Sequence, residues 1–287
     1  MLWPARVLWF LLPLSVGFVL RDAIGTWPSA TAMTAAVLLY AAWVAGLVAL
    51  VAVHPWSFTV LRVVAPSAAI ITIVAVRWAT FGIVVLAVVH AIAATVCCLH
   101  GSVAEACTQS AAYGDEVRRP LRTPPPLCLL LAIVVPITAA GISSGPLLLA
   151  NGGTVWGIVC LVVGLPLAAL LLRSLNSLTG RFLVFVPAGL ALSDPLTLPD
   201  PVLLPREKIL RLHNAPPRGR VDGVDARLGA VAGAIVILLD EPGTFTVRRG
   251  RGGAATREAS SVWCTPQRPS SVLAIAAERH VGAVKSS

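Results

Sequence analysis

The chain has 287 residues, of which 57% are apolar and only 12% are charged. This charged fraction is about half of the roughly 25% typical of soluble globular domains, which argues against a single water-soluble core. The formal net charge is +9. In so apolar a chain, a basic balance favours membrane topology and attraction to anionic lipid over nucleic-acid binding.

Six apolar segments are predicted to cross a membrane as helices, because about 20 apolar residues span the roughly 30 Å of hydrocarbon. The predicted spans are residues 3–20, 30–53, 61–77, 79–100, 127–149 and 154–172. Arg77 and Trp78 divide the two central spans, which together are too long for one helix. The first span is expected to be retained rather than cleaved as a signal peptide, because no small-x-small cleavage site precedes Arg21.

The distribution of arginine predicts the orientation of the spans. Short cytoplasmic loops carry an excess of Lys and Arg. With both termini inside, the inner side holds Arg6, Arg62, Arg118, Arg119, Arg122 and Arg173. The outer side then holds only Arg21 and Arg77. Both termini are therefore expected in the cytoplasm.

His90 is the ionisable residue nearest to the middle of a predicted span. An ionisable group at that depth is a candidate for a proton or ion pathway, which would suit a transporter or channel. A neutral imidazole bonded to a neighbouring helix is the alternative, and it is favoured because no Asp, Glu or Lys lies in the spans. Cys97 and His100 share an i, i+3 spacing but lack further metal ligands at a recognisable distance.

Residues 101–126 form the longest polar connection within the membrane half and are predicted to be a cytoplasmic loop. Its turn-forming and charged residues are either a topogenic basic loop or a contact site for lipid headgroups or a partner. The candidate contact residues are Tyr113, Asp115, Glu116, Arg118, Arg119 and Arg122.

Residues 181–287 show short apolar or alternating runs between Pro, Gly and Asp, a pattern typical of strands. Strands are predicted at residues 181–187, 189–193, 206–212, 231–239, 244–248 and 261–265. An amphipathic helix is predicted at 270–280, and loops at 214–227 and 249–260. Further candidate contacts for lipid phosphate or an acidic partner are Arg248, Arg249, Arg251 and Arg257. The fold class is thus an α-helical membrane bundle with a small β-rich α+β cytoplasmic domain.

Several stretches carry resemblances to known families. RFLVFVPAGLALSD, PREKILRL and VWCTPQRPSSVLAIAAERH look like the first strands, a middle strand and the closing strand and helix of bacterial pleckstrin-homology-like domains. The stretches AAYGDEVRRPLR, RFLVFVPAGLALSDPLTLPDPVLLPRE and TPQRP resemble recurrent stretches of an uncharacterised actinobacterial family of multi-pass membrane proteins. The resemblance implies a bacterial plasma membrane and brings no known activity.

No sequence motif predicts catalysis. The chain lacks a G-x-S-x-G elbow, H-E-x-x-H, a Walker loop and G-x-G-x-x-G, so no catalytic residue, cofactor or metal is predicted. The six cysteines lie mainly in or beside apolar runs, which does not favour disulfides. We therefore expect a membrane-anchored binding or scaffold protein, whose cytoplasmic domain contacts anionic lipid or another protein. A transporter or channel component using His90 is the alternative.

Overall fold

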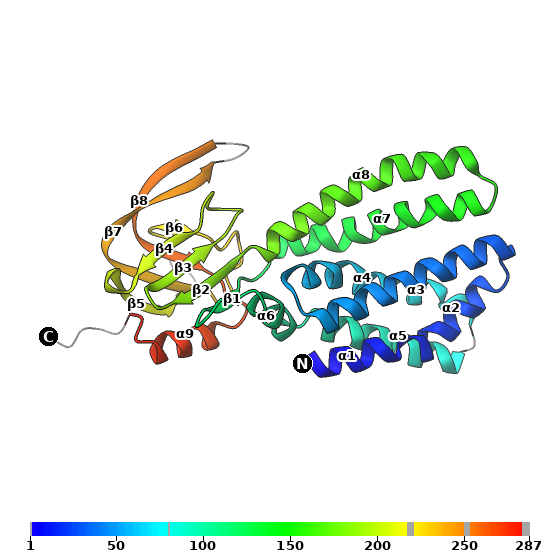
Figure 1. Ribbon diagram of the computed structural model, residues 1–287, viewed down its shortest axis with the longest axis horizontal. Coiled ribbons are helices and arrows are strands. Elements are labelled where there is room, and N and C mark those ends of the chain that lie inside the picture. Colours follow the sequence, from blue (N-terminus) through cyan, green and yellow to red (C-terminus); the bar gives the residue numbers. More distant parts are fainter. Residues whose placement is uncertain (1, 80, 217–220, 250–252, 283–287) are drawn as a thin grey trace. The chain divides into compact units, whose positions relative to one another are not determined.

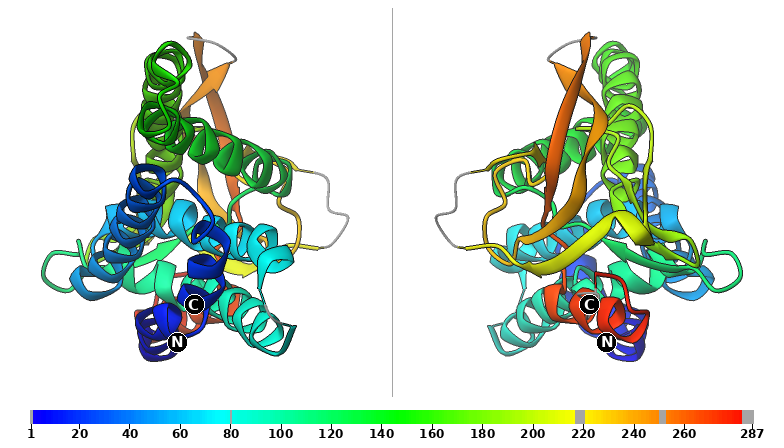
Figure 2. Two further views of the ribbon diagram at one scale, coloured as in Figure 1. Left: turned by 90° about the vertical axis from the view of Figure 1, so that its right-hand side faces the viewer. Right: turned by 90° about the vertical axis from the view of Figure 1, so that its left-hand side faces the viewer.

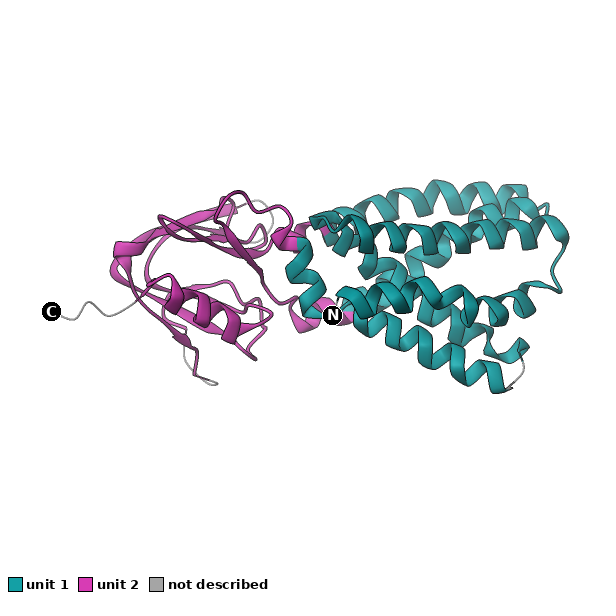
Figure 3. Cartoon of the chain, turned by 60° about the horizontal axis from the view of Figure 1, so that its bottom comes forward, with its two compact units in different colours: residues 1–107, 130–175 teal, residues 108–129, 176–287 magenta. Residues whose placement is uncertain are grey.

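A computed structural model describes residues 2–79, 81–216, 221–249 and 253–282 and divides the chain into two compact units (Figure 3). Unit 1 comprises residues 1–107 and 130–175, and unit 2 comprises residues 108–129 and 176–287. One hydrophobic core lies among the N-terminal helices of unit 1, and a second lies within unit 2.

Apolar helices make up unit 1 (Figure 1). They are α1 (Leu2–Leu11), η1 (Leu12–Leu14), α2 (Val16–Ile24), α3 (Ser29–Ala52), α4 (Pro55–Ala75), η2 (Val76–Trp78), α5 (Phe81–Cys98), α6 (Gly101–Gln109), α7 (Pro125–Ala150) and α8 (Thr154–Thr179). Among the described residues, five helical segments are long and apolar enough to cross a membrane, or six if the bent pair α5 and α6 counts as one. The prediction of a part built from long apolar helices is confirmed.

Several observed helices differ from the predicted spans. The fourth helix, α4, begins at Pro55 rather than at 61, because the His54 N–H donates to Ser57 Oγ at 3.1 Å in a capping box. Residues 3–20 are a broken helix, with the 3₁₀ turn η1 between α1 and α2. Pro13 explains the break, since proline lacks the N–H that a helix requires.

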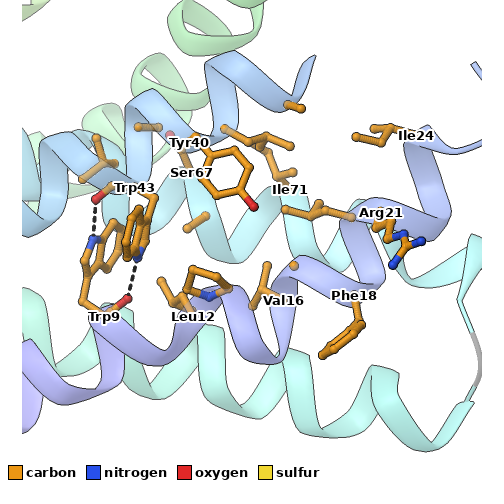
Figure 4. A pocket seen from close by; sticks show the side chains of 18 residues that line it. Trp9, Leu12, Val16, Phe18, Arg21, Ile24, Tyr40, Trp43, Ser67 and Ile71 are labelled. Carbon is orange, nitrogen blue, oxygen red and sulfur yellow. Dashed lines mark hydrogen bonds between the residues drawn. The ribbon is translucent and has the colours of Figure 1, made fainter. Parts of the chain in front are cut away.

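Two tryptophans supply hydrogen bonds at this break. Without an N–H at Pro13, the carbonyl of Trp9, four residues earlier, has no helical partner. The Trp43 indole N–H of α3 donates to that carbonyl at 2.9 Å, and the Trp9 indole donates to the Trp43 carbonyl at 2.9 Å (Figure 4). Arg6 Nε donates to the Leu50 carbonyl at 2.9 Å. Three hydrogen bonds therefore join α1 to α3.

Glycine allows this close approach of the helices. A Cβ atom at Gly46 of α3 would lie 2.4 Å from the Trp9 ring, so only glycine fits there. The helical pair α7 and α8 uses the same device, because a Cβ at Gly145 would lie 2.6 Å from Leu161. Gly152, in the turn that joins the pair, has a φ of +82°. Small residues at such contacts let apolar helices pack tightly.

The described residues of unit 2 form two four-stranded sheets and one closing helix (Figure 1). The first sheet has the order β1-β2-β3-β4, with strands β1 (Val117–Pro120), β2 (Phe182–Val186), β3 (Gly189–Ser193) and β4 (Val202–Pro205). The second has the order β5-β7-β8-β6, with strands β5 (Ile209–Asn214), β6 (Val224–Asp225), β7 (Ile235–Arg249) and β8 (Gly253–Cys264). The predicted C-terminal β-rich region is confirmed in kind.

Both sheets and the final helix share one core. The inward residues include Phe185, Leu190 and Ile237, and the helix α9 (Pro269–Glu278) adds Val272 and Ala276. A short 3₁₀ turn, η3 (Arg206–Lys208), precedes β5. The buried sides of strands and helix thus close over a common apolar interior.

The expected loop at 101–126 is wrong in part. It contributes helix α6 and strand β1, which pairs antiparallel with β2 from Val117 opposite Phe185 to Pro120 opposite Phe182. The charged sequence VRRP concealed this strand, because its partner lies more than 60 residues further along the chain. A loop was also expected at 249–260, but Gly253–Cys264 is strand β8. Residues 217–220 of the expected 214–227 loop lie outside the described residues.

We predict that Gly46→Ala destabilises unit 1. The new methyl would overlap the Trp9 ring, and overpacking of this kind costs about 1–3 kcal/mol. The matched control is Gly141→Ala in α7, where a Cβ meets nothing within 4 Å. Thermal unfolding in detergent, followed by far-ultraviolet circular dichroism, should show a lower Tm for Gly46→Ala only. Equal Tm values for the two variants would contradict the tight contact.

Candidate functional site

The candidate contact residues 113–122, here called the Arg118 loop, are built into unit 2. The side-chain amide of Gln109 donates to the Glu116 carbonyl at 2.9 Å and accepts from the Arg118 N–H at 2.8 Å. Arg279, which follows α9, donates to the Asp115 carbonyl at 2.6 Å. These contacts hold the backbone of the loop beside β2 and α9. Tyr113 is 86% exposed.

Most cations of the Arg118 loop already have partners. Arg118 Nη2 lies 2.9 Å from Glu116 Oε2, and this hydrogen bond lowers the pKa of the Glu116 carboxyl. The Arg118 guanidinium also stacks 5.4 Å from the Phe182 ring centroid. Arg122 Nη1 donates to the Ala232 carbonyl at 3.0 Å. Arg119 Nη1 makes a long 3.4 Å contact to the Arg118 carbonyl.

The charged side chains of the Arg118 loop therefore mainly stabilise its own conformation. Arg118 carries its own counter-ion, and Arg122 faces a backbone carbonyl. A cation that already has a close anionic partner contributes less to attracting a second one. The loop is a weaker candidate for anion binding than its sequence indicates.

The other candidates, Arg248 and Arg249, lie at the far end of the β7–β8 hairpin. Residues 243–249 pair with 253–259, whereas β5 and β6 pair only with residues 235–239 and 262–263. The outer part is therefore a two-stranded extension, here called the ribbon, which projects beyond the neighbouring strands (Figures 1 and 2).

Exposed arginines lie on both faces of the ribbon. Consecutive strand residues point to opposite faces, so Arg248 and Arg249 diverge. Arg257 stands opposite Phe245 and shares the face of Arg249. All three side chains are exposed and make no hydrogen bond or ion pair with another described residue. The last predicted contact, Arg251, lies outside the described residues.

His90 in α5 has hydrogen bonds at both ring nitrogens. Nε2 lies 2.9 Å from the Leu8 carbonyl, which can only accept, so Nε2 carries the proton. Nδ1 lies 2.6 Å from the Ser15 hydroxyl, a second hydrogen bond. Leu8 and Ser15 lie on either side of η1, so His90 helps to stabilise the helix break. This geometry supports the interpretation of His90 as a packing residue that is hydrogen-bonded to a neighbouring helix.

Arg181 and Asp194 form a buried ion pair that the sequence interpretation missed. Arg181 Nε lies 2.8 Å from Asp194 Oδ1, and Nη2 lies 3.0 Å from Oδ2. The side chains are only 2% and 0% exposed. Arg181 also donates to the carbonyls of Ala226 at 2.8 Å and Arg122 at 3.1 Å. One guanidinium thus connects three separate segments of unit 2.

A signal for this pair exists in the sequence. Strands β2 and β3 pair with Phe182 opposite Ser193, so Arg181 and Asp194 are the next opposed positions. Opposite charges at equal distances from a hairpin turn are expected to meet. The nearby thiol of Cys264 is fully buried, and this burial raises its pKa to about 12. A protonated, enclosed thiol reacts slowly, so Cys264 is a structural residue.

The described residues contain no group of three or more His, Cys, Asp or Glu side chains positioned to hold a metal ion. Helices of membrane-spanning length together with a C-terminal β-sheet region place the chain in the class of membrane proteins with an appended β domain. No known protein family, curated protein or solved structure matches the chain.

We predict that Asp194→Asn opens unit 2 locally. It removes the charge that balances buried Arg181, and breaking a buried pair costs about 3–5 kcal/mol. Alkylation of Cys264, measured by peptide mass spectrometry, should accelerate by about 100-fold or more. In the control Asp225→Asn, which breaks the more exposed pair with Arg227, the rate should change less than about fivefold. Similar rates in the two variants would contradict a central role for the buried pair.

Proposed function

We propose that this protein is a membrane-anchored binding or scaffold module whose ribbon recruits an acidic protein partner. The observation that carries the proposal is the two-stranded extension of β7 and β8, where the side chains of Arg248, Arg249 and Arg257 are exposed and make no hydrogen bond or ion pair with another described residue. An acidic segment would neutralise these cations, which Glu258 balances only in part.

The backbone of the ribbon supports the same proposal. Over residues 243–249 and 253–259, each strand is paired on one side only, so the outer edges offer backbone donors and acceptors. One of these donors, the Arg248 N–H, is already bonded to the Thr197 carbonyl at 2.8 Å. An extended peptide can add to such an edge as a further strand, with arginines beside it selecting acidic side chains.

We further propose that unit 2 is a pleckstrin-homology-like domain of the actinobacterial family named above. Two four-stranded sheets followed by the closing helix α9 support this proposal. Unit 2 is not continuous in sequence, because α7 and α8 lie between strands β1 and β2 in the chain. The helical hairpin is in effect an insertion between the first two strands.

We propose that unit 2 and both termini lie in the cytoplasm of a bacterium, with the turn between α7 and α8 outside. The arginine distribution supports this orientation. An impermeant thiol reagent applied to intact cells should label Asn151→Cys, which lies in that exposed turn, but not Tyr113→Cys. Labelling of the unaltered protein, which contains only the native cysteines, is measured in parallel and subtracted. Labelling of Tyr113→Cys alone would reverse the orientation.

We predict that charge reversal on the ribbon abolishes partner recruitment. A photo-crosslinking residue at Thr246, which is exposed on β7, should capture a protein in native membranes. Arg248→Glu with Arg249→Glu should reduce that product at least tenfold, because attraction to acidic groups becomes repulsion. Raising the ionic strength should weaken it as well, since exposed charges are screened.

The control is Arg206→Glu with Lys208→Glu, an equal charge reversal on the exposed turn η3. This variant should retain the crosslinked product. If both double variants lost the crosslinked product equally, the loss would reflect the net charge of unit 2 and would contradict a specific role of the ribbon. Capture of lipid alone, with no protein product, would also refute recruitment of an acidic protein.

A further inference from the structure

A largely apolar cavity of 420 Å³ lies between α1, α2, α3 and α4 of unit 1 (Figure 4). Aliphatic side chains such as Leu12, Val16, Leu39 and Ile71 form much of its wall. The volume falls within the range of about 300–1,000 Å³ typical of small-molecule sites. These helices are long and apolar enough to cross a membrane, and in a membrane the open side of the cavity would face lipid.

One end of the cavity offers no hydrogen-bond donors. There the indole N–H groups of Trp9 and Trp43 are bonded to each other's backbone carbonyls. The hydroxyl of Ser67, further along the wall, donates to the Val63 carbonyl at 2.8 Å. These groups present rings and aliphatic carbon to an occupant. A polar ligand would lose its hydration there without gaining partners.

The opposite end offers a positive charge. Arg21 lines the cavity away from the tryptophans and makes no side-chain hydrogen bond or ion pair with another described residue (Figure 4). It lies one turn before the end of α2 and six residues before Trp27, a residue type enriched at the membrane interface. Between the two ends, the Tyr40 hydroxyl points into the cavity and has no partner among the described residues.

We propose that this cavity binds one acyl chain of an anionic phospholipid. The phosphate lies at Arg21, and the chain runs along the aliphatic wall toward Trp9 and Trp43. About 12 residues of α1, η1 and α2 separate Trp9 from Arg21, and at the helical rise of 1.5 Å per residue they would cover roughly 18 Å, which suits an extended chain. Tyr40 donates a hydrogen bond to an ester oxygen, which can only accept. The distribution of charge along the cavity selects the anionic headgroup over a zwitterionic one.

The test compares lipid binding to the full chain in detergent by native mass spectrometry. The protein is incubated with phosphatidylglycerol or with phosphatidylcholine of the same chains. We expect one retained phosphatidylglycerol and a preference over phosphatidylcholine of about fivefold, the effect of one arginine near the membrane surface. Arg21→Ala should abolish the preference. Arg77→Ala, whose side chain stacks on Trp78 outside the cavity, should leave it unchanged.

A second pair of variants tests the cavity itself. Ala36→Leu fills space in the wall and should reduce retention of both lipids severalfold. Ala41→Leu, on the same helix but outside the lining, should not. Equal binding of both lipids by the unaltered protein, equal effects of Arg21→Ala and Arg77→Ala, or equal effects of the two leucine variants would overturn the proposal. A dimer mass without bound lipid would instead assign the cavity to a second copy of the chain.

Discussion

A backbone carbonyl in an apolar surrounding needs a hydrogen-bond donor, because leaving it unpaired costs several kcal/mol. Pro13 creates this requirement at the Trp9 carbonyl of the first membrane helix, and Trp43 meets it by donating to that carbonyl. Close to the same break, His90 donates to the Leu8 carbonyl. These two bonds therefore fix α1 against both α3 and α5, since each donor comes from a different helix. A helix without the proline would not offer the Trp9 carbonyl to Trp43.

The same requirement organises unit 2 around Arg181. Leu121 follows the last residue of β1 and precedes α7. Its N–H donates to the Arg181 carbonyl at 2.9 Å. The Arg181 side chain returns a hydrogen bond to the next carbonyl, that of Arg122. Arg181 itself follows α8 directly, so these bonds join the two chain segments that enter and leave the helical hairpin. Asp194 supplies the charge that makes this buried guanidinium tolerable.

Sequence patterns predict the elements of this molecule better than its connections. The length of apolar runs is sufficient for helices such as α3, and a short apolar run between Gly180 and Pro187 is sufficient for strand β2, because both signals are local. Strand β1 has only four residues and two arginines, and its pairing depends on β2 far along the chain. The Trp9 and Trp43 exchange likewise requires two helices to be in register. Among the predicted contact residues, the sequence allowed one geometric inference: consecutive residues of a strand point to opposite faces, so Arg248 and Arg249 had to diverge.

The positive charge of the chain does not correspond to one binding surface. Arg118, Arg122 and Arg181 donate to a carboxylate or to carbonyls that no helix or strand satisfies, so their charge serves the fold. Arg248 and Arg249 lie where the ladder between β7 and β8 already pairs the backbone, and their side chains have no such task. The arginine side chains of the ribbon are therefore available to a partner, unlike most of those in the Arg118 loop. This difference is why we propose the ribbon, rather than the Arg118 loop, as the recognition surface of unit 2.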